Sequence, residues 1–314
     1  MIFSRLSIYT LVALGALLMS LSARAEQLIL PPLGTDLVGS LREVVAQQNE
    51  SLSDIARRFD LGHNEIDHAN PNVDHWLPKA GTEVLLPTRY ILPAAPRRGL
   101  VLNLPEMRVY YYPKSSASDE TAKLITYPVS IGRMDWKTPM GFTRIVKKVK
   151  DPAWYPPASI KKEALEKGEP LPDVVPAGPD NPLGQHSLRL SMSGYLMHGT
   201  NKPYGVGMRV SHGCLRFYPE DIAELFDLVS VNTRVNIINQ PVKAGWFMGM
   251  LYLEVHPPLD EDEHIEQTLR HAAMEAINQA RLGYEDLGLV SGRAVKRAVT
   301  ERRGIPVPIL KQPL

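Results

Sequence analysis

The sequence predicts a mainly β domain, sandwich-like with one packed helix, between a small strand-helix-helix-strand unit and a helical tail. Residues 98–239 are rich in β-branched and aromatic runs that Gly, Pro and Asn interrupt, a pattern typical of sheets. Residues 41–88 carry two short helical patterns between strand-like runs, and residues 240–314 carry apolar residues at helical spacing. A chain of 314 residues with 44% apolar side chains favours two modest domains.

Residues 1–25 have the pattern of a secretory signal peptide. Arg5 precedes an apolar run from about Ile8 to Met19, and Ala23-Arg24-Ala25 forms an A-x-A cleavage site. The run is shorter than the ~20 residues of a membrane-spanning helix. We therefore predict an exported protein that is cleaved after about Ala25 and whose mature chain has no transmembrane segment.

The charge balance argues against two classes of partner. The chain has 35 Lys and Arg against 34 Asp and Glu, and cleavage would remove Arg5 and Arg24 but no acid. The mature chain would then carry a net charge of about −1. A general affinity for nucleic acid or for an anionic membrane surface is not indicated.

Residues 41–88 are predicted to form a βααβ unit. Ser51 and Asp54 make a capping-box pair at the start of one helix, and Pro71 follows the end of the second. The runs SLSDIARRFDLGHNEIDHANP and GTEVLLP resemble a LysM domain, a module that binds the N-acetylglucosamine-containing strands of peptidoglycan or chitin. The resemblance implies glycan strands as a partner. Segment 48–51 departs from it, because such modules usually have a Gly-Asp-Thr turn there.

The β domain contains one clear helix and one long irregular segment. Residues 92–99 are Pro-rich and indicate a linker in front of the domain. Pro219 begins the helix, and Ile222 and Leu225 then fall on one of its faces. Eight prolines between residues 151 and 184 are too many for a core strand, so we predict a long loop or lid.

Residues 240–314 are predicted to be a helical extension that packs on the β domain. No catalytic motif is found in them. Their three histidines are expected to be solvated: His256, His264 and His271.

The single cysteine of the chain, Cys214, lies in the run RVSHGCLRF. In an oxidising compartment a lone thiol is a buried apolar residue, an intermolecular link or a reactive group. A thiol nucleophile needs an imidazole, because an unperturbed cysteine with a pKa of ~8.5 is only a few per cent thiolate at neutral pH. His212 points the same way as Cys214 on an extended segment, and His198 would reach it by chain return. Gly213 would let a substrate carbonyl approach closely, and the backbone N–H groups beside it could form an oxyanion hole.

Three short runs together resemble the signature of the L,D-transpeptidase (YkuD) family. They are HGT at His198, SHGC starting thirteen residues later, and the Leu-Arg pair that follows. Further matches are TPMG at 138–141, PAGPDNPLG at 176–184 and RVNIINQPV near the end of the domain. The resemblance covers nearly all of the mature chain. It is greatest for Gram-negative periplasmic members with a LysM-like segment in front and a helical tail behind, and so implies a periplasmic protein.

The resemblance implies a complete set of site residues. They are Cys214 as nucleophile, His198 as general base, the Gly199 carbonyl as the group that orients the imidazole, and His212, Ser211 and Gly213 as residues that shape the pocket. The predicted substrate contacts are Arg209, Arg216 and Tyr204. Of these, the two arginines would hold stem carboxylates in bidentate fashion.

The implied reaction is acyl transfer on peptidoglycan tetrapeptide stems. Cys214 would attack the carbonyl at the L-centre of meso-diaminopimelate, expel the terminal D-alanine and form a thioester, which an amine then resolves. The amine belongs to a second stem, giving a 3-3 crosslink, or to the C-terminal lysine of an outer-membrane lipoprotein, which the tail and the LysM-like segment favour. No cofactor is predicted.

Four other interpretations stay open. Water could be the acceptor, which would make the protein an L,D-carboxypeptidase, or the fold could be an inactive glycan-binding adaptor. His198, His212 and Cys214 could bind zinc, although no HExxH or CxxC pattern accompanies them. A papain-like protease has its cysteine before its histidine, and this chain has the reverse order.

Overall fold

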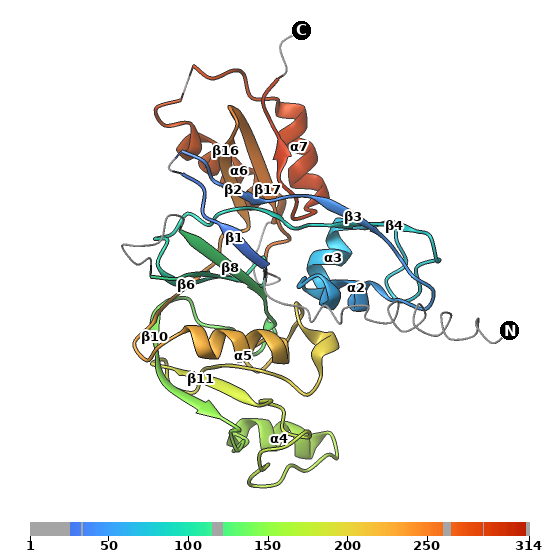
Figure 1. The fold of residues 1–314 in the computed structure, drawn as a ribbon, viewed down its shortest axis with the longest axis vertical. Coiled ribbons are helices and arrows are strands. Elements are labelled where there is room, and N and C mark those ends of the chain that lie inside the picture. Colours follow the sequence, from blue (N-terminus) through green and yellow to red (C-terminus); the bar gives the residue numbers. More distant parts are fainter. Residues whose placement is uncertain (1–25, 33, 115–121, 260–264, 285, 312–314) are drawn as a thin grey trace, which may run out of the picture.

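The computed structural model describes residues 26–32, 34–114, 122–259, 265–284 and 286–311 (Figure 1). The predicted signal peptide lies outside these residues. No helix within the described ranges is long and apolar enough to cross a membrane.

A curled nine-stranded sheet forms the centre of the molecule (Figure 1). In spatial order its strands are β1 (Glu26–Ile29), β8 (Lys123–Pro128), β7 (Arg108–Tyr112), β6 (Gly99–Asn103), β15 (Arg234–Ile238), β10 (Gly141–Lys150), β11 (His186–Leu190), β12 (Leu196–His198) and β14 (Leu215–Arg216). The helix α5 (Pro219–Leu228) begins at the predicted proline and contacts β11. Ile222 and Leu225 of this helix are fully buried in the core, together with Tyr127 and Phe217. The prediction of a mainly β domain with one packed helix is therefore confirmed.

Two short elements lie beside the sheet and carry residues of the site. The strand β13 (Arg209–Ser211) pairs in parallel with β9 (Ile131–Gly132). The 3-10 turn η1 (Pro203–Gly205) precedes β13. The helix α4 (Ala158–Glu166) lies within the proline-rich segment, which was predicted to be a loop, and it projects at one end of the molecule (Figure 1).

Residues 41–88 have the predicted order of strand, helix, helix and strand. The elements are β3 (Arg42–Val45), α2 (Leu52–Arg58), α3 (His63–Ala69) and β4 (Glu83–Leu86). The capping box of Ser51 and Asp54 is present at α2. This βααβ unit has its own small core, and it is connected through two paired strands, β2 (Leu37–Gly39) and β5 (Arg89–Ile91).

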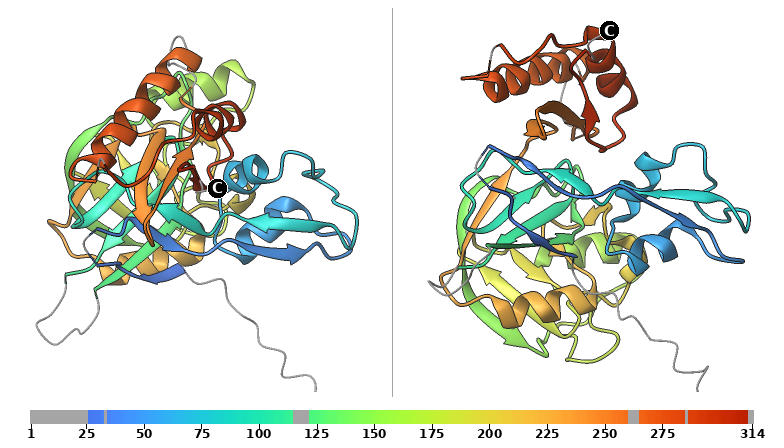
Figure 2. Two further views of the ribbon diagram at one scale, coloured as in Figure 1. Left: turned by 90° about the horizontal axis from the view of Figure 1, so that it is seen from above. Right: turned by 45° about the horizontal axis from the view of Figure 1, so that its top comes forward.

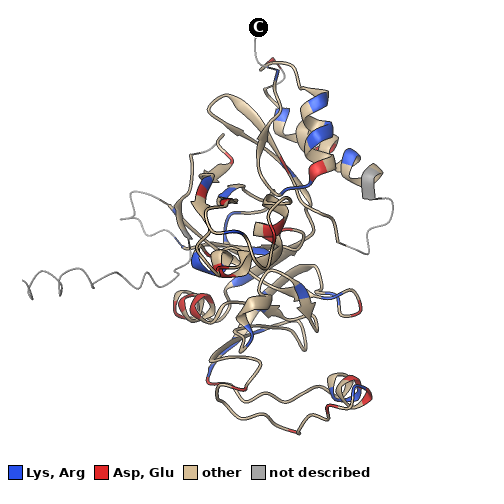
Figure 3. Ribbon diagram, turned by 90° about the vertical axis from the view of Figure 1, so that its right-hand side faces the viewer, with Lys and Arg blue, Asp and Glu red and all other residues tan. Residues whose placement is uncertain are grey.

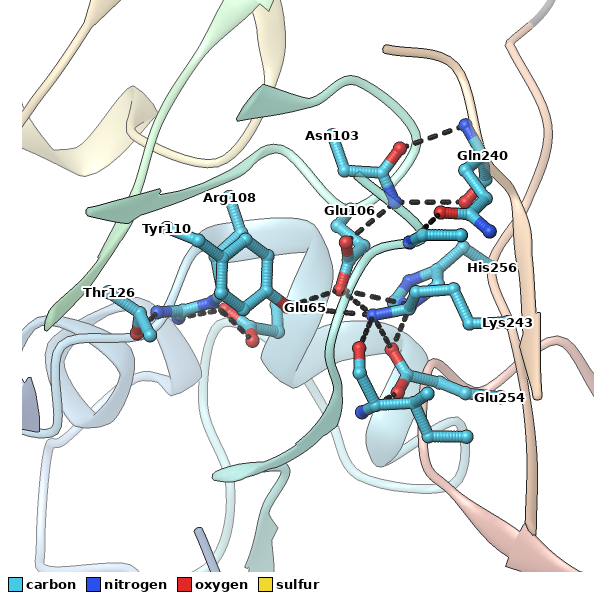
Figure 4. Close-up of polar contacts among 12 residues, drawn as sticks. Glu65, Asn103, Glu106, Arg108, Tyr110, Thr126, Gln240, Lys243, Glu254 and His256 are labelled. Atoms are coloured by element: carbon cyan, nitrogen blue, oxygen red, sulfur yellow. Dashed lines mark hydrogen bonds and ion pairs between the residues drawn. The ribbon is translucent and has the colours of Figure 1, made fainter. Parts of the chain in front are cut away.

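The βααβ unit is joined to the central sheet by buried polar contacts. The guanidinium of Arg108, on β7, is 1% exposed and lies 2.7 Å from Glu65 Oε2 of α3 (Figure 4). It also donates to the carbonyl of Asp60 at 3.0 Å. Gly62 meets Gly207, a residue with φ +84°, so closely that a Cβ on Gly207 would lie 2.4 Å from the Gly62 Cα. The unit is therefore packed against the domain that carries Cys214.

Residues 240–314 differ from the predicted helical extension, because three strands accompany the helices. The elements are β16 (Val242–Phe247), β17 (Met250–Val255), α6 (Ile265–Arg281), α7 (Gly292–Glu301) and β18 (Val307–Pro308). Met248 and Gly249 join β16 to β17 with φ values of 50° and 72°, as a two-residue hairpin turn requires. This three-stranded sheet and its two helices lie together beside the rest of the molecule (Figure 2). They share a separate core.

A buried ion-pair network connects this C-terminal sheet to the central one (Figure 4). The ammonium of Lys243 is 1% exposed, donates to Glu106, and lies 2.7 Å from Glu254 Oε1. It also donates to the carbonyl of Ile91 at 2.6 Å. His256 is buried against Glu254, with Nε2 2.6 Å from Oε1, so the prediction that it is solvated is wrong. It is buried because it completes this charged cluster. His264 lies outside the described residues.

Candidate active site

The predicted base lies on β12 and the predicted nucleophile directly precedes β14, and both line the same cavity. In the parallel pair of β12 and β14, Met197 lies opposite Leu215 and His198 opposite Arg216. Met197 and Leu215 are buried in the core. Since side chains alternate along a strand, His198 and Arg216 point to the other face, and so does Cys214, two residues before Arg216. All three line one cavity of about 480 Å³.

His198 is held as a neutral imidazole. Its Nδ1 lies 2.6 Å from the carbonyl of Gly199. Because a carbonyl only accepts, Nδ1 carries the hydrogen and Nε2 keeps its lone pair. Burial, and secondarily the charge of Arg216, lower the pKa of His198 to about 4, against a smaller opposite effect of the Gly199 carbonyl. At neutral pH this imidazole can therefore accept a proton.

Cys214 is a thiol at rest. Burial raises its pKa, while the backbone N–H of Leu196 and the charge of Arg216 oppose that rise. The sulfur lies 3.8 Å from the carbonyl of Gly194, toward which the thiol donates. A neutral thiol and a neutral imidazole thus line the same cavity, so a proton has to move to a base during attack.

Three residues fix the backbone of the loop that carries Cys214. Ser211 Oγ donates to the carbonyl of Cys214 at 2.6 Å and accepts from the N–H of Gly213 at 3.2 Å. Thr138 Oγ1 donates to the carbonyl of Gly213 at 3.0 Å. Gly213 has φ +95°, and a Cβ there would lie 2.9 Å from a ring carbon of Tyr195. Glycine is thus required for the path of the loop, and the Gly213 N–H, since it is bonded to Ser211, is not a free oxyanion donor.

The structure brings together some of the predicted substrate contacts and not others. Arg216 lines the cavity, and its Nε is buried without an acceptor among the described residues. Arg209 and Tyr204 are not part of the cavity wall: Arg209 Nε donates to the carbonyl of Gly132, and Tyr204 is 63% exposed on η1. Arg189 of β11 lines the cavity instead.

His212 is tied to the lid segment (residues 151–185). Its Nε2 lies 2.9 Å from Oε2 of Glu163 on α4. Its ring lies edge-on to Trp136, with the centroids 5.1 Å apart. His212 also lines the cavity, so the structure places both predicted histidines at the site.

Three residues at the site were not predicted as site residues. Thr138 belongs to the TPMG run, but its contact with Gly213 joins positions 75 residues apart. Arg189 carries a weak local signal, since it is the charged residue between Leu188 and Leu190, which are buried while Arg189 is exposed. Glu163 has no local signal, because its partner His212 lies 49 residues away.

Possible metal ligands gather elsewhere. In the ranges that the structure describes, one group of side chains has ligand atoms within 4.8 Å of one another: Glu106, Glu254 and His256. The ammonium of Lys243 lies between the two carboxylates and supplies the balancing positive charge. A larger hollow of about 870 Å³, lined by residues such as Arg98 and Arg234, contains neither cysteine nor histidine.

Known proteins of one class resemble this chain. The model of the L,D-transpeptidase catalytic domain (YkuD) matches residues 97–237. The Escherichia coli protein named Probable L,D-transpeptidase YcfS is 39% identical over 314 residues, which cover 98% of this chain and 95% of that protein. Probable L,D-transpeptidase YbiS, also from Escherichia coli, is 39% identical over 292 residues, which cover 91% and 92%.

Solved structures show a much weaker likeness. An L,D-transpeptidase from Mycobacterium smegmatis is 21% identical, with a TM-score of 0.34, and the match covers 50% of this chain and 63% of that one. The assignment therefore depends on the relatives that match along almost their whole length. The chain belongs to the L,D-transpeptidase family, a class of enzymes that act on peptidoglycan stems.

Proposed function

We propose that this chain is a periplasmic L,D-transpeptidase in which Cys214 is the nucleophile. The observation that carries the proposal is that Cys214 shares one cavity with a neutral histidine, His198, whose free ring nitrogen can take the thiol proton. The signal-peptide pattern of residues 1–25 supports the periplasmic location.

In the first half-reaction the proton of Cys214 moves to His198 Nε2 as the sulfur attacks the carbonyl at the L-centre of meso-diaminopimelate. A tetrahedral intermediate forms. It collapses when the bond to D-alanine breaks, and His198 returns the proton to the departing amine. The product is a thioester of Cys214 and free D-alanine.

In the second half-reaction an acceptor amine attacks the thioester. His198 takes a proton from the amine, and the new amide bond forms as the sulfur leaves and is protonated again. Arg216 supports the binding of the acidic stem, because its buried Nε has no acceptor in the described part of the chain. Arg189 is a second cation in the same cavity.

For the acceptor we propose the C-terminal lysine of an outer-membrane lipoprotein. The support is the arrangement of the chain, in which a LysM-like unit precedes and an extension follows the catalytic domain, as in family members that attach lipoproteins. Muropeptides from a strain without this gene should lack protein-linked stems, and overexpression should restore them. Loss of 3-3 crosslinks with unchanged protein linkage would identify a second stem as the acceptor instead.

Replacing His198 with alanine should lower D-alanine release from a soluble tetrapeptide by about 10²- to 10⁴-fold, the usual contribution of a general base. The control is His186→Gln. His186 is a half-buried histidine of β11 whose ring contacts Phe226, and it does not line the cavity. A loss that is equal in both variants would contradict the role of His198.

The pH profile of wild-type kcat/KM should be flat from about pH 5 to pH 8. A base works only while it is unprotonated, and the pKa of His198 is about 4 in the folded protein, so activity should fall only as the pH drops toward that value. Initial rates of D-alanine release across this range provide the measurement. An acid limb near pH 6.5, the ordinary value for histidine, would assign the base role to another group.

A further inference from the structure

The lid helix α4 has no buried apolar face. None of its nine residues is buried. It lies at one end of the molecule and carries charges of both signs (Figure 3). Helices in proteins are usually held by an apolar face, so α4 needs another means of staying over the cavity that Ile160 and Ser159 help to line.

The base of the lid segment is fixed, in contrast to its helix. The N–H of Asp151 donates to the carbonyl of Gln185 at 2.7 Å, which joins the two ends of the segment. Asn181, 1% exposed, donates from its side chain to the carbonyls of Pro152 and Pro176. The two ends of the lid segment are therefore fixed by hydrogen bonds, whereas the position of its middle part depends on the contacts of α4.

Glu163 makes the polar contacts that hold α4 down. Its Oε2 lies 2.6 Å from Arg133 and 2.9 Å from His212 Nε2, and Lys167 of the lid binds Oε1. Within the described parts of the chain, the pairs with Arg133 and His212 are the ion pairs that connect α4 to residues outside the lid segment. Donation by Arg133, then by Lys167 and His212, holds the pKa of the Glu163 carboxyl well below its usual range. It is therefore ionised at neutral pH.

The contact between Glu163 and His212 connects the lid segment to the loop that carries Cys214. His212 precedes Gly213 and Cys214 directly and lines the cavity. With Nε2–H donated to Glu163, the ring orientation of His212 is set by a carboxylate that belongs to the lid. Arg133 reinforces the link, since its own N–H donates to the carbonyl of Ser211 in the same loop.

We propose that Glu163 is a positioning residue that couples closure of the lid segment to the orientation of His212. With the carboxylate engaged, α4 covers the cavity and the catalytic loop is held in its reactive arrangement. When the carboxylate leaves, both are released together. This inference rests on the proposed function in one respect: a covered cavity keeps water from the thioester of Cys214 while an amine is delivered.

The test compares Glu163→Gln with Glu166→Gln. Glu166 lies on the same helix, has a side chain that is 64% exposed, and forms an ion pair with Lys162 at 3.9 Å. It is not part of the cavity wall, so Glu166→Gln removes the same charge as Glu163→Gln away from the site. Purified full-length proteins receive a tetrapeptide donor and a fixed concentration of amine. Two quantities are measured: the ratio of transfer to hydrolysis products, and the hydrogen exchange rate of residues 158–166.

The Glu163→Gln variant should lower the transfer ratio and raise the exchange rate, each by about two- to fivefold, as expected for loss of a partly exposed charge pair. Glu166→Gln should match the wild type in both, and Glu163→Asp, which keeps the charge, should recover part of the loss. Equal effects of Glu163→Gln and Glu166→Gln, or no effect of either, would overturn the proposal.

Failure of the proposed function would look different. If the wild type released no D-alanine, hydrogen exchange would still report whether Glu163 holds α4 in place. Faster exchange in Glu163→Gln, and not in Glu166→Gln, would then still support the lid contact. If Glu163→Gln failed to fold, Arg133→Gln, which removes the second attachment, should show the same loss of transfer ratio. An unchanged ratio in that variant would count against the coupling.

Discussion

Cys214→Ala is expected to abolish release of D-alanine from a tetrapeptide donor, with a loss on the order of 10⁶-fold, comparable to removing the nucleophile of a serine protease. Cys214 is the single cysteine of the chain, so no second thiol lines the cavity to replace it as the nucleophile. Cys214→Ser should be nearly inactive as well, because a hydroxyl is far harder to deprotonate than a thiol beside the same base.

Mass spectrometry provides the direct measurement for this variant. A carbapenem, whose strained carbonyl resembles an acyl donor, should add once to the wild type at Cys214 and not at all to Cys214→Ala. The matched control is Ser193→Ala, another small polar residue of the cavity wall, which should keep both the adduct and the activity. Circular dichroism should show an unchanged fold. D-alanine release by Cys214→Ala, or an adduct at another residue, would remove Cys214 from the role of nucleophile.

Local sequence signals were sufficient for much of this structure. Ser51 and Asp54 cap a helix where their spacing indicates, and Pro219 begins α5. These features depend on neighbours within one turn, so a single sequence contains them. The SHGC run that contains Cys214 is also a local signal. His198 comes from a separate run, and the parallel pairing of β12 with β14 brings it to the same face.

Features with an atypical local sequence, or with a partner far away in the chain, were not predicted. The sequence 242–255 was predicted as part of a helical extension, although its strands join through a two-residue turn in which Met248 adopts φ +50°, a conformation uncommon for methionine. The helix α4 was not predicted, because the prolines on both sides of it indicate an irregular segment. The contact of Glu163 with His212 depends on how the lid folds back, and no local pattern reports it.

The same distinction applies to the βααβ unit, which the sequence presents as a separable module. A tethered glycan anchor would raise local concentration on peptidoglycan without affecting turnover of a soluble donor. The structure instead buries Arg108 of the central sheet against Glu65 of the unit. The Tyr218 hydroxyl, beside α5, donates to the carbonyl of Leu61 at 3.0 Å. The N–H of His63 donates to the carbonyl of Val206, in the loop that leads to β13.

Deleting residues 41–87 should therefore reduce activity on soluble tetrapeptide as much as on intact sacculi. The deletion can be closed without strain, because Ser40 and Thr88 are hydrogen-bonded across the stem of the unit at 3.0 Å, so a two-residue Asn-Gly turn can join them. The measurement is a paired assay of full-length and shortened protein on both substrates. A loss confined to sacculi would show that the unit acts as a glycan anchor alone.

A single substitution tests the same interface without removing the unit. Glu65→Gln leaves the guanidinium of Arg108 buried without its counter-charge, which should lower the free energy of unfolding by about 3–5 kcal/mol. Glu83→Gln, on an exposed position of β4 in the same unit, removes the same charge and should change the free energy of unfolding by less than about 0.5 kcal/mol. Urea denaturation of the two variants gives the comparison. Equal stabilities would mean that the unit contributes little to the fold around Cys214, and the deletion should then spare the soluble substrate.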